Sequence, residues 1–389
     1  MRILQVHNHY QQYGGEDAVV KAEGELLKSQ GEEVFLYERS NAEIQNQNPF
    51  RQFQTFTHLS FSSQSYREIK KILREIKPDI CHVYNTFFMI TPAVYQACAE
   101  DEVPVVQSLY NYRWMCANAI FLREGKNCEE CLEHSRLRAI QHGCYKNSRF
   151  MTAIVVRMQN DNWKNKIFGQ PSAYITATEF TKRKYTQAGI PAEKILVKPH
   201  FMDVSREERQ ENQRHALYIG RISEEKGIRV LLKAWRNFKD VPLKIIGQGP
   251  LLDEVRNTVR QENLNAEVLG YCSDEDYIRC LKSSKFVVVP SICHDNFPRT
   301  IVEAYAYGVP VIGSDLDGIR EYIKEKKSGF LFTPGDPRSL SAKIYDLLKS
   351  DHATLGANAR SEFELHYTGQ RNYEILKDLY ERIAGSSEN

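Results

Sequence analysis

Short runs of β-branched and aromatic residues alternate with longer amphipathic stretches along this chain. In the first half these runs predict strands at 2–8, 32–38, 79–85, 103–110, 173–178 and 195–199. The same rhythm restarts in the second half and predicts strands at 216–220, 243–247, 266–271, 285–290, 309–315 and 329–334. Stretches such as 16–30 and 63–77, which lie between strands, have helical spacing. Strands that alternate with helices are typical of covered parallel sheets, so the predicted fold class is α/β with two Rossmann-like domains.

A polar, charged segment without an apolar face, 205–215, separates the two series and is predicted to be a linker. A chain of 389 residues is long enough for two domains of roughly 150 to 200 residues each. We predict an N-terminal domain at 1–204 and a C-terminal domain at 205–365. A last helix is expected within 366–389, and we predict that it packs back on the N-terminal domain.

Composition and charge exclude several classes of protein. The chain has 52 basic and 50 acidic side chains and a net charge of +2, which argues against a nucleic-acid-binding protein. No run approaches the roughly 18 apolar residues that a membrane span needs. The first residues show no signal-peptide pattern, so we expect a cytoplasmic protein. The nine cysteines are an odd number, which favours reduced thiols over a disulfide framework.

Ligands bind parallel α/β sheets at the carboxyl ends of the strands, so the loops there are the candidate sites. The first strand is followed by Gly14-Gly15-Glu16, where a helix begins. Glycines at a helix start let the backbone N–H groups approach an anion closely, but the same residues also occur in an ordinary turn. In the second half, Gly220-Arg221 and Lys226 would present two cations to one small pocket. The alternative is a pair of solvated loop charges.

Seven residues separate two carboxylates around a predicted helix start, in the segment ICHDNFPRTIVEAYAYGVPVIGSD. Asp295 stands just ahead of Pro298, and Glu303 lies inside the helical run. Acidic residues near a helix start often act as caps, which is the plain interpretation of Asp295.

Four motifs, taken together, resemble those of the retaining nucleotide-sugar glycosyltransferases of family four, the glycosyl transferases group 1. The motifs are Gly14-Gly15, Gly220-Arg221 with Lys226-Gly227, Ile246-Gly247-Gln248-Gly249-Pro250, and Asp295 to Glu303 followed by Gly308-Val309-Pro310-Val311. The resemblance covers nearly the whole chain. It implies the GT-B fold, in which two Rossmann-like domains face each other across a cleft. It also implies transfer of a sugar from a nucleotide-diphosphate donor to a hydroxyl acceptor with retention, in polysaccharide, glycolipid or other glycoconjugate biosynthesis.

The resemblance assigns a role to each charged motif residue. It implies that Arg221 and Lys226 hold the donor diphosphate, that Glu303 accepts hydrogen bonds from the ribose, and that Asp295 holds the transferred sugar. Two cations there would stabilise the charge on the leaving group, so no cofactor is expected for catalysis. The other expected donor contacts are Gly14, Gly15, Gly220, Gly247, Gly249, Pro250, Tyr271, Asn296, Phe297 and Pro298.

In the first half of the chain, the expected contacts to the acceptor or to the transferred sugar are Glu16, His82 and Tyr110. The chain departs from the family at Tyr110, where a histidine is usual, and at Asp295 and Asn296, where glutamate and glycine are usual. A lone histidine such as His82 also has a structural interpretation. Two alternatives therefore stay open: a catalytically inert subunit that binds nucleotide-sugar, and a nucleotide-sugar 2-epimerase.

Four cysteines lie in one long connection between strands: Cys116, Cys128, Cys131 and Cys144. A C-x-x-C pair with two further thiols can form a tetrahedral structural zinc site, and four ordinary thiols are the alternative.

Between residues 134 and 166, seven lysines and arginines face a single acid, Asp161, with apolar residues interleaved. Such a basic amphipathic segment could rest peripherally on the anionic inner face of a membrane, where lipid-linked acceptors are found; a solvated face is the alternative. The expected partners are a nucleotide-diphosphate sugar and a sugar, lipid-linked or small-molecule acceptor, with no nucleic acid.

Overall fold

The computed structural model describes residues 1–11, 14–44, 48, 55, 59–204, 214–296 and 298–385. Phe297, an expected donor contact, and most of the predicted linker lie outside the described residues. The chain divides into two compact units. The first unit comprises residues 1–120, 129–198 and 372–389, and the second unit comprises residues 121–128 and 199–371.

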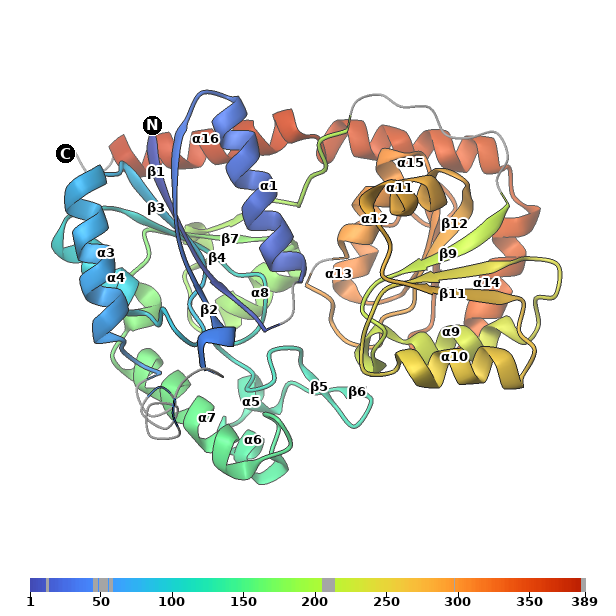
Figure 1. Cartoon of the computed structure of the whole chain (residues 1–389), viewed down its shortest axis with the longest axis horizontal. Coiled ribbons are helices and arrows are strands. Elements are labelled where there is room, and N and C mark those ends of the chain that lie inside the picture. Colours follow the sequence, from blue (N-terminus) through green and yellow to red (C-terminus); the bar gives the residue numbers. More distant parts are fainter. Residues whose placement is uncertain are drawn as a thin grey trace. The chain divides into compact units, whose positions relative to one another are not determined.

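The first unit is built on a six-stranded parallel sheet with the strand order β2-β1-β3-β4-β7-β8 (Figure 1). Its strands are β1 (Arg2–His9), β2 (Glu33–Ser40), β3 (Ile80–Asn85), β4 (Val105–Ser108), β7 (Ala173–Thr176) and β8 (Ile195–Val197). Every residue of β3, β4 and β7 is buried, because helices cover both faces of a parallel sheet. All six strands predicted in the first half are therefore present.

The α-helices of the first unit are α1 (Gly15–Ser29), α3 (Ser63–Ile76), α4 (Ala93–Glu100), α5 (Glu130–Glu133), α6 (Leu137–His142), α7 (Arg149–Lys164) and α8 (Glu179–Gln187). Short 3-10 turns occur at η1 (Asn41–Ile44), η2 (Ile167–Gly169) and η3 (Ala192–Lys194).

Helix α3 shows how the sequence sets these elements. Its buried residues Ile69 and Leu73 lie four positions apart and so share one face. The side chain of Ser62 caps the start of the helix by accepting a hydrogen bond from the backbone N–H of Ser65. The helix is followed by Lys77, which has a left-handed backbone conformation and precedes a proline.

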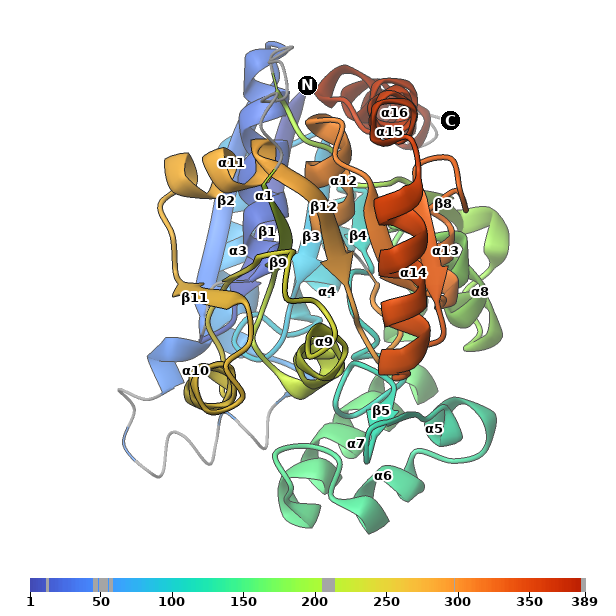
Figure 2. The ribbon, with the colours of Figure 1, turned by 90° about the vertical axis from the view of Figure 1, so that its right-hand side faces the viewer.

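The second unit repeats the architecture with the strand order β11-β10-β9-β12-β13-β14 (Figure 2). Its strands are β9 (His215–Ile219), β10 (Leu243–Ile246), β11 (Ala266–Gly270), β12 (Ser284–Val289), β13 (Val311–Ser314) and β14 (Gly329–Phe332). Alternate residues of β9 enter different cores: Ala216 and Tyr218 join one hydrophobic cluster, and Leu217 joins the other. Because side chains alternate across a strand, both faces of this sheet are buried.

The α-helices that contribute to the second unit are α9 (Ile228–Trp235), α10 (Leu252–Gln261), α11 (Asp274–Lys282), α12 (Arg299–Ala306), α13 (Asp317–Arg320), α14 (Pro337–Lys349) and α15 (His352–His366). A 3-10 turn, η4 (Glu224–Lys226), precedes α9, and a small hairpin of β5 (Leu122–Arg123) and β6 (Lys126–Asn127) groups with this unit.

Helix α16 (Gly369–Gly385) follows a break after α15, and from residue 372 it belongs to the first unit. There the Tyr380 hydroxyl lies 2.7 Å from His82 Nδ1, and the Tyr373 hydroxyl donates to Glu32 Oε1 over 2.8 Å. These hydrogen bonds connect the end of the chain to the sheet and to the residues just before β2.

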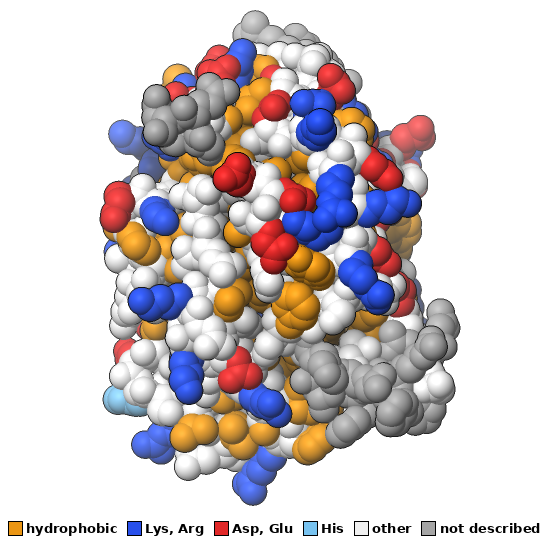
Figure 3. All heavy atoms as spheres, turned by 90° about the vertical axis from the view of Figure 1, so that its left-hand side faces the viewer, with side chains coloured by type: hydrophobic (Ala, Val, Ile, Leu, Met, Phe, Trp, Pro, Cys, Tyr) orange, Lys and Arg blue, Asp and Glu red, His pale blue; other side chains and the backbone are white. Residues whose placement is uncertain are grey.

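Charged side chains of both signs are interspersed on the face drawn in Figure 3, in keeping with the near-zero net charge. Among the described residues, no helix combines the length and apolar character that crossing a bilayer requires.

Candidate functional site

The chain order of the second sheet reverses between β9 and β12. From β9 the chain adds β10 and β11 on one side, and then returns to place β12 on the other side. Ligands bind α/β sheets outside the carboxyl ends of the two strands at such a switch point. The loops after β9 and β12 contain the charged residues singled out from the sequence, so the topology brings two distant motifs to one sheet edge.

Backbone segments approach each other very closely in these loops. A Cβ atom added at Gly247, where φ is +144°, would lie 1.9 Å from the carbonyl oxygen of Gly220. A Cβ at Gly249, where φ is +159°, would lie 2.3 Å from the oxygen of Ile222, whose N–H donates to the Gln248 carbonyl over 2.8 Å. The glycine-rich motifs are therefore required to pack the loops after β9 and β10 against each other.

Lys226 and Asp295 form an ion pair across this edge. Asp295 Oδ2 also accepts from the Ser291 hydroxyl over 3.1 Å, and about one third of the Lys226 side chain stays exposed. Burial lowers the pKa of Lys226, but the Asp295 carboxylate outweighs this effect, so the pKa lies above its ordinary value and the ammonium stays charged. Asp295 thus positions a cation at the carboxyl ends of β9 and β12.

Glu303 lies in α12, which begins at Arg299 directly after Pro298. Its carboxylate accepts a hydrogen bond from the Tyr277 hydroxyl and pairs with the Arg299 guanidinium over 3.0 Å. Burial and the neighbouring Glu303 raise the pKa of Tyr277 well above its ordinary value, so the phenol stays protonated and donates a hydrogen bond to the carboxylate. Two donors therefore fix the direction of this carboxylate.

Arg221 is exposed, and its side chain has no hydrogen bond or ion pair among the described residues. Within the residues that the structure describes, neither Arg221 nor Glu303 forms a hydrogen bond or an ion pair with Lys226 or Asp295. Tyr271, in the loop after β11, is 77% exposed. The structure thus joins two of the four expected catalytic residues directly and leaves one guanidinium facing solvent.

In the first unit, Gly14 is the residue that precedes α1, and Gly15 begins that helix. Glu16 Oε1 accepts from the Asn111 side-chain amide over 2.8 Å. Desolvation is the main reason that the pKa of Glu16 is raised. Pro250 lies in the loop that leads to α10, and Asn296 stands two residues ahead of Pro298.

His82 is completely buried in β3, and both of its ring nitrogens are in hydrogen-bonding contact, Nδ1 with Tyr380 and Nε2 with the Ser108 hydroxyl at 2.8 Å. Burial lowers the pKa of His82 well below its ordinary value. These contacts favour the structural interpretation of His82 over an acceptor contact. Tyr110 is also buried and lines a small pocket with Phe87, Arg113 and Tyr185.

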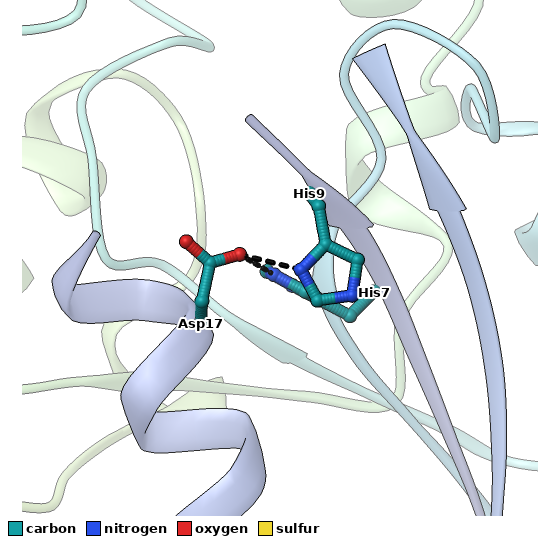
Figure 4. Close-up of side chains that lie close together, drawn as sticks. All are labelled: His7, His9 and Asp17. Carbon is teal, nitrogen blue, oxygen red and sulfur yellow. Dashed lines mark hydrogen bonds and ion pairs between the residues drawn. The ribbon is translucent and has the colours of Figure 1, made fainter. Parts of the chain in front are cut away.

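The structure brings together one set of metal-ligand atoms in the described part of the chain. The set comprises His7, His9 and Asp17, whose ligand atoms lie within 4.8 Å of one another (Figure 4). The four cysteines do not form such a set there; Cys116 is buried and the other three are half-buried. Structural zinc at the cysteines stays a prediction. The sequence analysis missed the histidine set. The pattern H-x-H in a strand is a usable signal for such a set, because residues i and i+2 lie on the same face of the strand.

Residues 203–362 match the family described as Glycosyl transferases group 1. Among curated proteins, the chain is 26% identical to the amylovoran biosynthesis glycosyltransferase AmsK of Erwinia amylovora, over 56% of this chain and 58% of that protein. It is 29% identical to the phosphatidyl-myo-inositol mannosyltransferase of Mycobacterium leprae, over 44% and 47% of the two chains. The matches span about half the length of these curated relatives.

Two solved structures match the fold of nearly the whole chain. Sucrose-phosphate synthase from Thermosynechococcus elongatus has a TM-score of 0.73 at 17% identity and covers 99% of both chains. Anabaena HepE in complex with UDP has a TM-score of 0.67 at 17% identity, with 97% of this chain and 99% of that one covered. The resemblance to group 1 glycosyltransferases is therefore confirmed over residues 203–362, and the predicted GT-B fold class, with two parallel-sheet Rossmann-like units, is confirmed as well.

Proposed function

We propose that this chain is a glycosyltransferase that moves a sugar from a nucleotide-diphosphate donor to a hydroxyl acceptor with retention of anomeric configuration. Its premise is the glycosyl transferases group 1 match over residues 203–362 on a GT-B fold. The observation that carries the proposal is the Lys226–Asp295 ion pair, together with the exposed Arg221 of the loop after β9, at the switch point of the second sheet.

The donor diphosphate would contact the two cations of this edge. Breaking the bond between the anomeric carbon and the phosphate oxygen places negative charge on the diphosphate, and preorganised positive groups there give the largest catalytic stabilisation. Lys226 is held in place by Asp295, and Arg221 is available to a ligand. Binding of the diphosphate would release Asp295 from Lys226 to accept hydrogen bonds from the hydroxyls of the transferred sugar.

Glu303 suits the ribose of the nucleotide. Tyr277 and Arg299 hold its carboxylate in one direction, and a carboxylate has lone pairs enough to accept from two neighbouring hydroxyls as well. In the proposed reaction the acceptor oxygen bonds to the anomeric carbon on the face that the phosphate leaves, and the departing phosphate oxygen takes the acceptor's proton. No protein nucleophile and no metal take part in this step.

The first unit would bind the acceptor, for which we propose a growing polysaccharide or a glycolipid. The curated relatives are named for amylovoran biosynthesis and for mannosyl transfer to phosphatidyl-myo-inositol, and they support this class. Helices α6 and α7 also place apolar and basic side chains at the surface, since Leu137 is 59% and Phe150 is 63% exposed and Arg138 and Arg149 are exposed. We propose that this surface touches anionic lipid. It should bind vesicles that contain phosphatidylglycerol more tightly than neutral vesicles, and the preference should fall in the variant Arg138→Glu/Arg149→Glu.

The test is a donor screen on the full chain. UDP-glucose, UDP-galactose, UDP-N-acetylglucosamine and GDP-mannose are each incubated with the protein, and release of nucleoside diphosphate is measured with and without sugar acceptors. Arg221→Ala should lower kcat/KM about 10- to 100-fold, as expected for one lost charge-assisted contact. Arg236→Ala is the matched control, because this arginine pairs with Glu262 on a surface of the same unit.

The outcomes separate the alternatives. Release of nucleotide with transfer of the sugar supports the proposal, and the anomeric configuration of the product, read by NMR, tests retention. Binding without turnover would point to an inert nucleotide-sugar-binding subunit, and a donor sugar converted to its 2-epimer would point to an epimerase. Wild-type rates in Arg221→Ala would refute the assignment of the diphosphate site.

A further inference from the structure

The first sheet has its own switch point, between β1 and β3. From β1 the chain places β2 on one side and β3 on the other, so the end of β1 occupies the position where α/β sheets bind ligands. His7 and His9 are in the last three residues of this strand, and Asp17 follows in the first turn of α1. None of these three residues has a part in the proposed donor site.

Three ligand atoms converge at this position. His7 Nε2 lies 2.9 Å and His9 Nδ1 lies 2.7 Å from the same oxygen, Asp17 Oδ1. The two imidazole rings come from one face of β1, are perpendicular to each other with centroids 4.6 Å apart, and turn their nitrogens toward the carboxylate (Figure 4). The side chains of His7 and Asp17 are buried, whereas about one third of the His9 side chain is exposed.

The surroundings hold the ligand groups by their remaining atoms. The Gly14 N–H donates to Asp17 Oδ2 over 2.7 Å, which leaves Oδ1 as the oxygen presented to the histidines. His9 Nε2 lies 3.0 Å from Glu38 Oε2 on the neighbouring strand β2. A carboxylate on the far nitrogen of a histidine is the usual outer contact of a metal-bound imidazole, and it fixes both the ring and its tautomer. His7 Nδ1 has no partner among the described residues, so the ring is oriented by its contact with Asp17.

We infer that His7, His9 and Asp17 form a binding site for a divalent transition-metal ion of the zinc type. Two imidazole nitrogens and one carboxylate oxygen are a ligand set that zinc accepts, and three protein ligands leave a coordination position open for water or a substrate oxygen. Around a tetrahedral ion with bonds of about 2.0 to 2.1 Å, ligand atoms lie about 3.4 Å apart. The rings would therefore move outward by about half an ångström from their hydrogen-bonded positions, and the partly exposed ring of His9 is free to do so.

The alternative is a hydrogen-bonded cluster in which both rings donate N–H groups to Asp17. The two arrangements use the same residues but differ in what they bind. A metal site takes up one equivalent of ion and loses it when a ligand is removed, whereas a hydrogen-bonded cluster takes up none.

The experiment titrates the full chain, first freed of metal with a chelator, with Zn2+ and Co2+. The background variant Cys128→Ser/Cys131→Ser removes the C-x-x-C pair, which supplies two of the four thiols of the predicted structural zinc site. We expect one equivalent of Zn2+ to bind, and Co2+ to give visible absorption bands without a thiolate charge-transfer band. Mg2+, which prefers oxygen ligands, should not compete at equal concentration.

Variants then locate the ion. His9→Gln should raise the Kd for Zn2+ by at least about 100-fold, and Glu38→Gln should raise it about tenfold through loss of the outer contact. Both residues are partly exposed, so these variants are expected to fold even where Asp17→Asn does not, since asparagine has one side-chain oxygen in place of the two that contact Gly14 and the histidines. His366→Gln is the matched control, since His366 is exposed and lies in α15.

The inference is overturned if less than about half an equivalent of Zn2+ binds in the Cys128→Ser/Cys131→Ser background, or if His9→Gln in that background binds it as tightly as the parent protein does. Neither result bears on the proposed transferase activity, which is measured separately with sugar nucleotides and Arg221 variants. Conversely, a protein without transferase activity that still bound one Zn2+ at these residues would leave the metal site standing.

Discussion

Replacing Asp295 by asparagine should separate nucleotide binding from sugar transfer. The change keeps the size of the side chain and removes the charge that pairs with Lys226. In the proposed complex, the donor diphosphate must take Lys226 from Asp295, so the ion pair opposes nucleotide binding. Without the carboxylate this competition is gone, and a nucleoside diphosphate that lacks the sugar should bind more tightly.

The size of the gain follows from the exposure of the pair. Charge-assisted hydrogen bonds contribute about 1.5 to 3 kcal/mol when buried, and exposed ion pairs contribute about 0.2 to 1 kcal/mol. The Asp295 side chain is 10% exposed and the Lys226 side chain is 31% exposed, which places the pair between the two classes. A net competition of about 1 kcal/mol corresponds to roughly fivefold tighter binding.

Transfer should change in the opposite direction. Asp295 is proposed to accept hydrogen bonds from the transferred sugar, and an amide is a weaker acceptor than a carboxylate, so kcat/KM should fall about 10- to 100-fold. Isothermal titration with UDP and GDP measures the first effect, and nucleotide release in the donor screen measures the second. Asp315→Asn is the control for the change in net charge, because Asp315 pairs with Arg320 at an exposed position.

The reasoning is refuted if Asp295→Asn weakens binding of the nucleoside diphosphate, since the carboxylate would then support the diphosphate site rather than compete with it. Unchanged transfer in the same variant would refute the contact with the sugar.

Three further predictions concern the two units. Gly247→Ala should destabilise the second unit by at least about 2 kcal/mol in urea unfolding, because the new Cβ would meet the Gly220 carbonyl at 1.9 Å; an unfolding free energy within 0.5 kcal/mol of wild type would show that the loops yield. Burial lowers the pKa of His215 to about 4, so between pH 6.5 and pH 4 the unfolded chain binds a proton that the folded chain does not. The free energy of unfolding should therefore fall with falling pH by at most about 1.4 kcal/mol per pH unit. His215→Asn should reduce this slope, and an equal slope in the variant would contradict the assignment. Lys198→Met should lower the free energy of unfolding by about 3 to 5 kcal/mol, because it leaves the fully buried Glu23 carboxylate without its cation. Adding Glu23→Gln to this variant should restore part of the lost stability. Additive losses in circular-dichroism melts would instead argue against coupling between the two residues.

Much of the architecture could be read from local patterns. The alternation of apolar strands with amphipathic helices predicted all twelve strands of the two parallel sheets, since a buried parallel strand needs a continuous apolar run and its crossover helix needs one apolar face. The loops at 220–227, 247–250 and 295–303 could also be selected, because glycines and charges that follow directly after a strand stand at the carboxyl edge of its sheet.

Tertiary structure decided which of these residues meet. Lys226 and Asp295 are 69 positions apart and pair because β9 and β12 are neighbours in the sheet, and strand order is not written in any local pattern. The carboxylate of Glu303 is directed by Tyr277, a residue of another helix. His82 is buried in β3, where its hydrogen-bonding partner Tyr380 comes from the other end of the chain. The cluster of His7, His9 and Asp17 went unnoticed for the same reason: its ligand atoms converge only when the first helix folds back along the strand that precedes it.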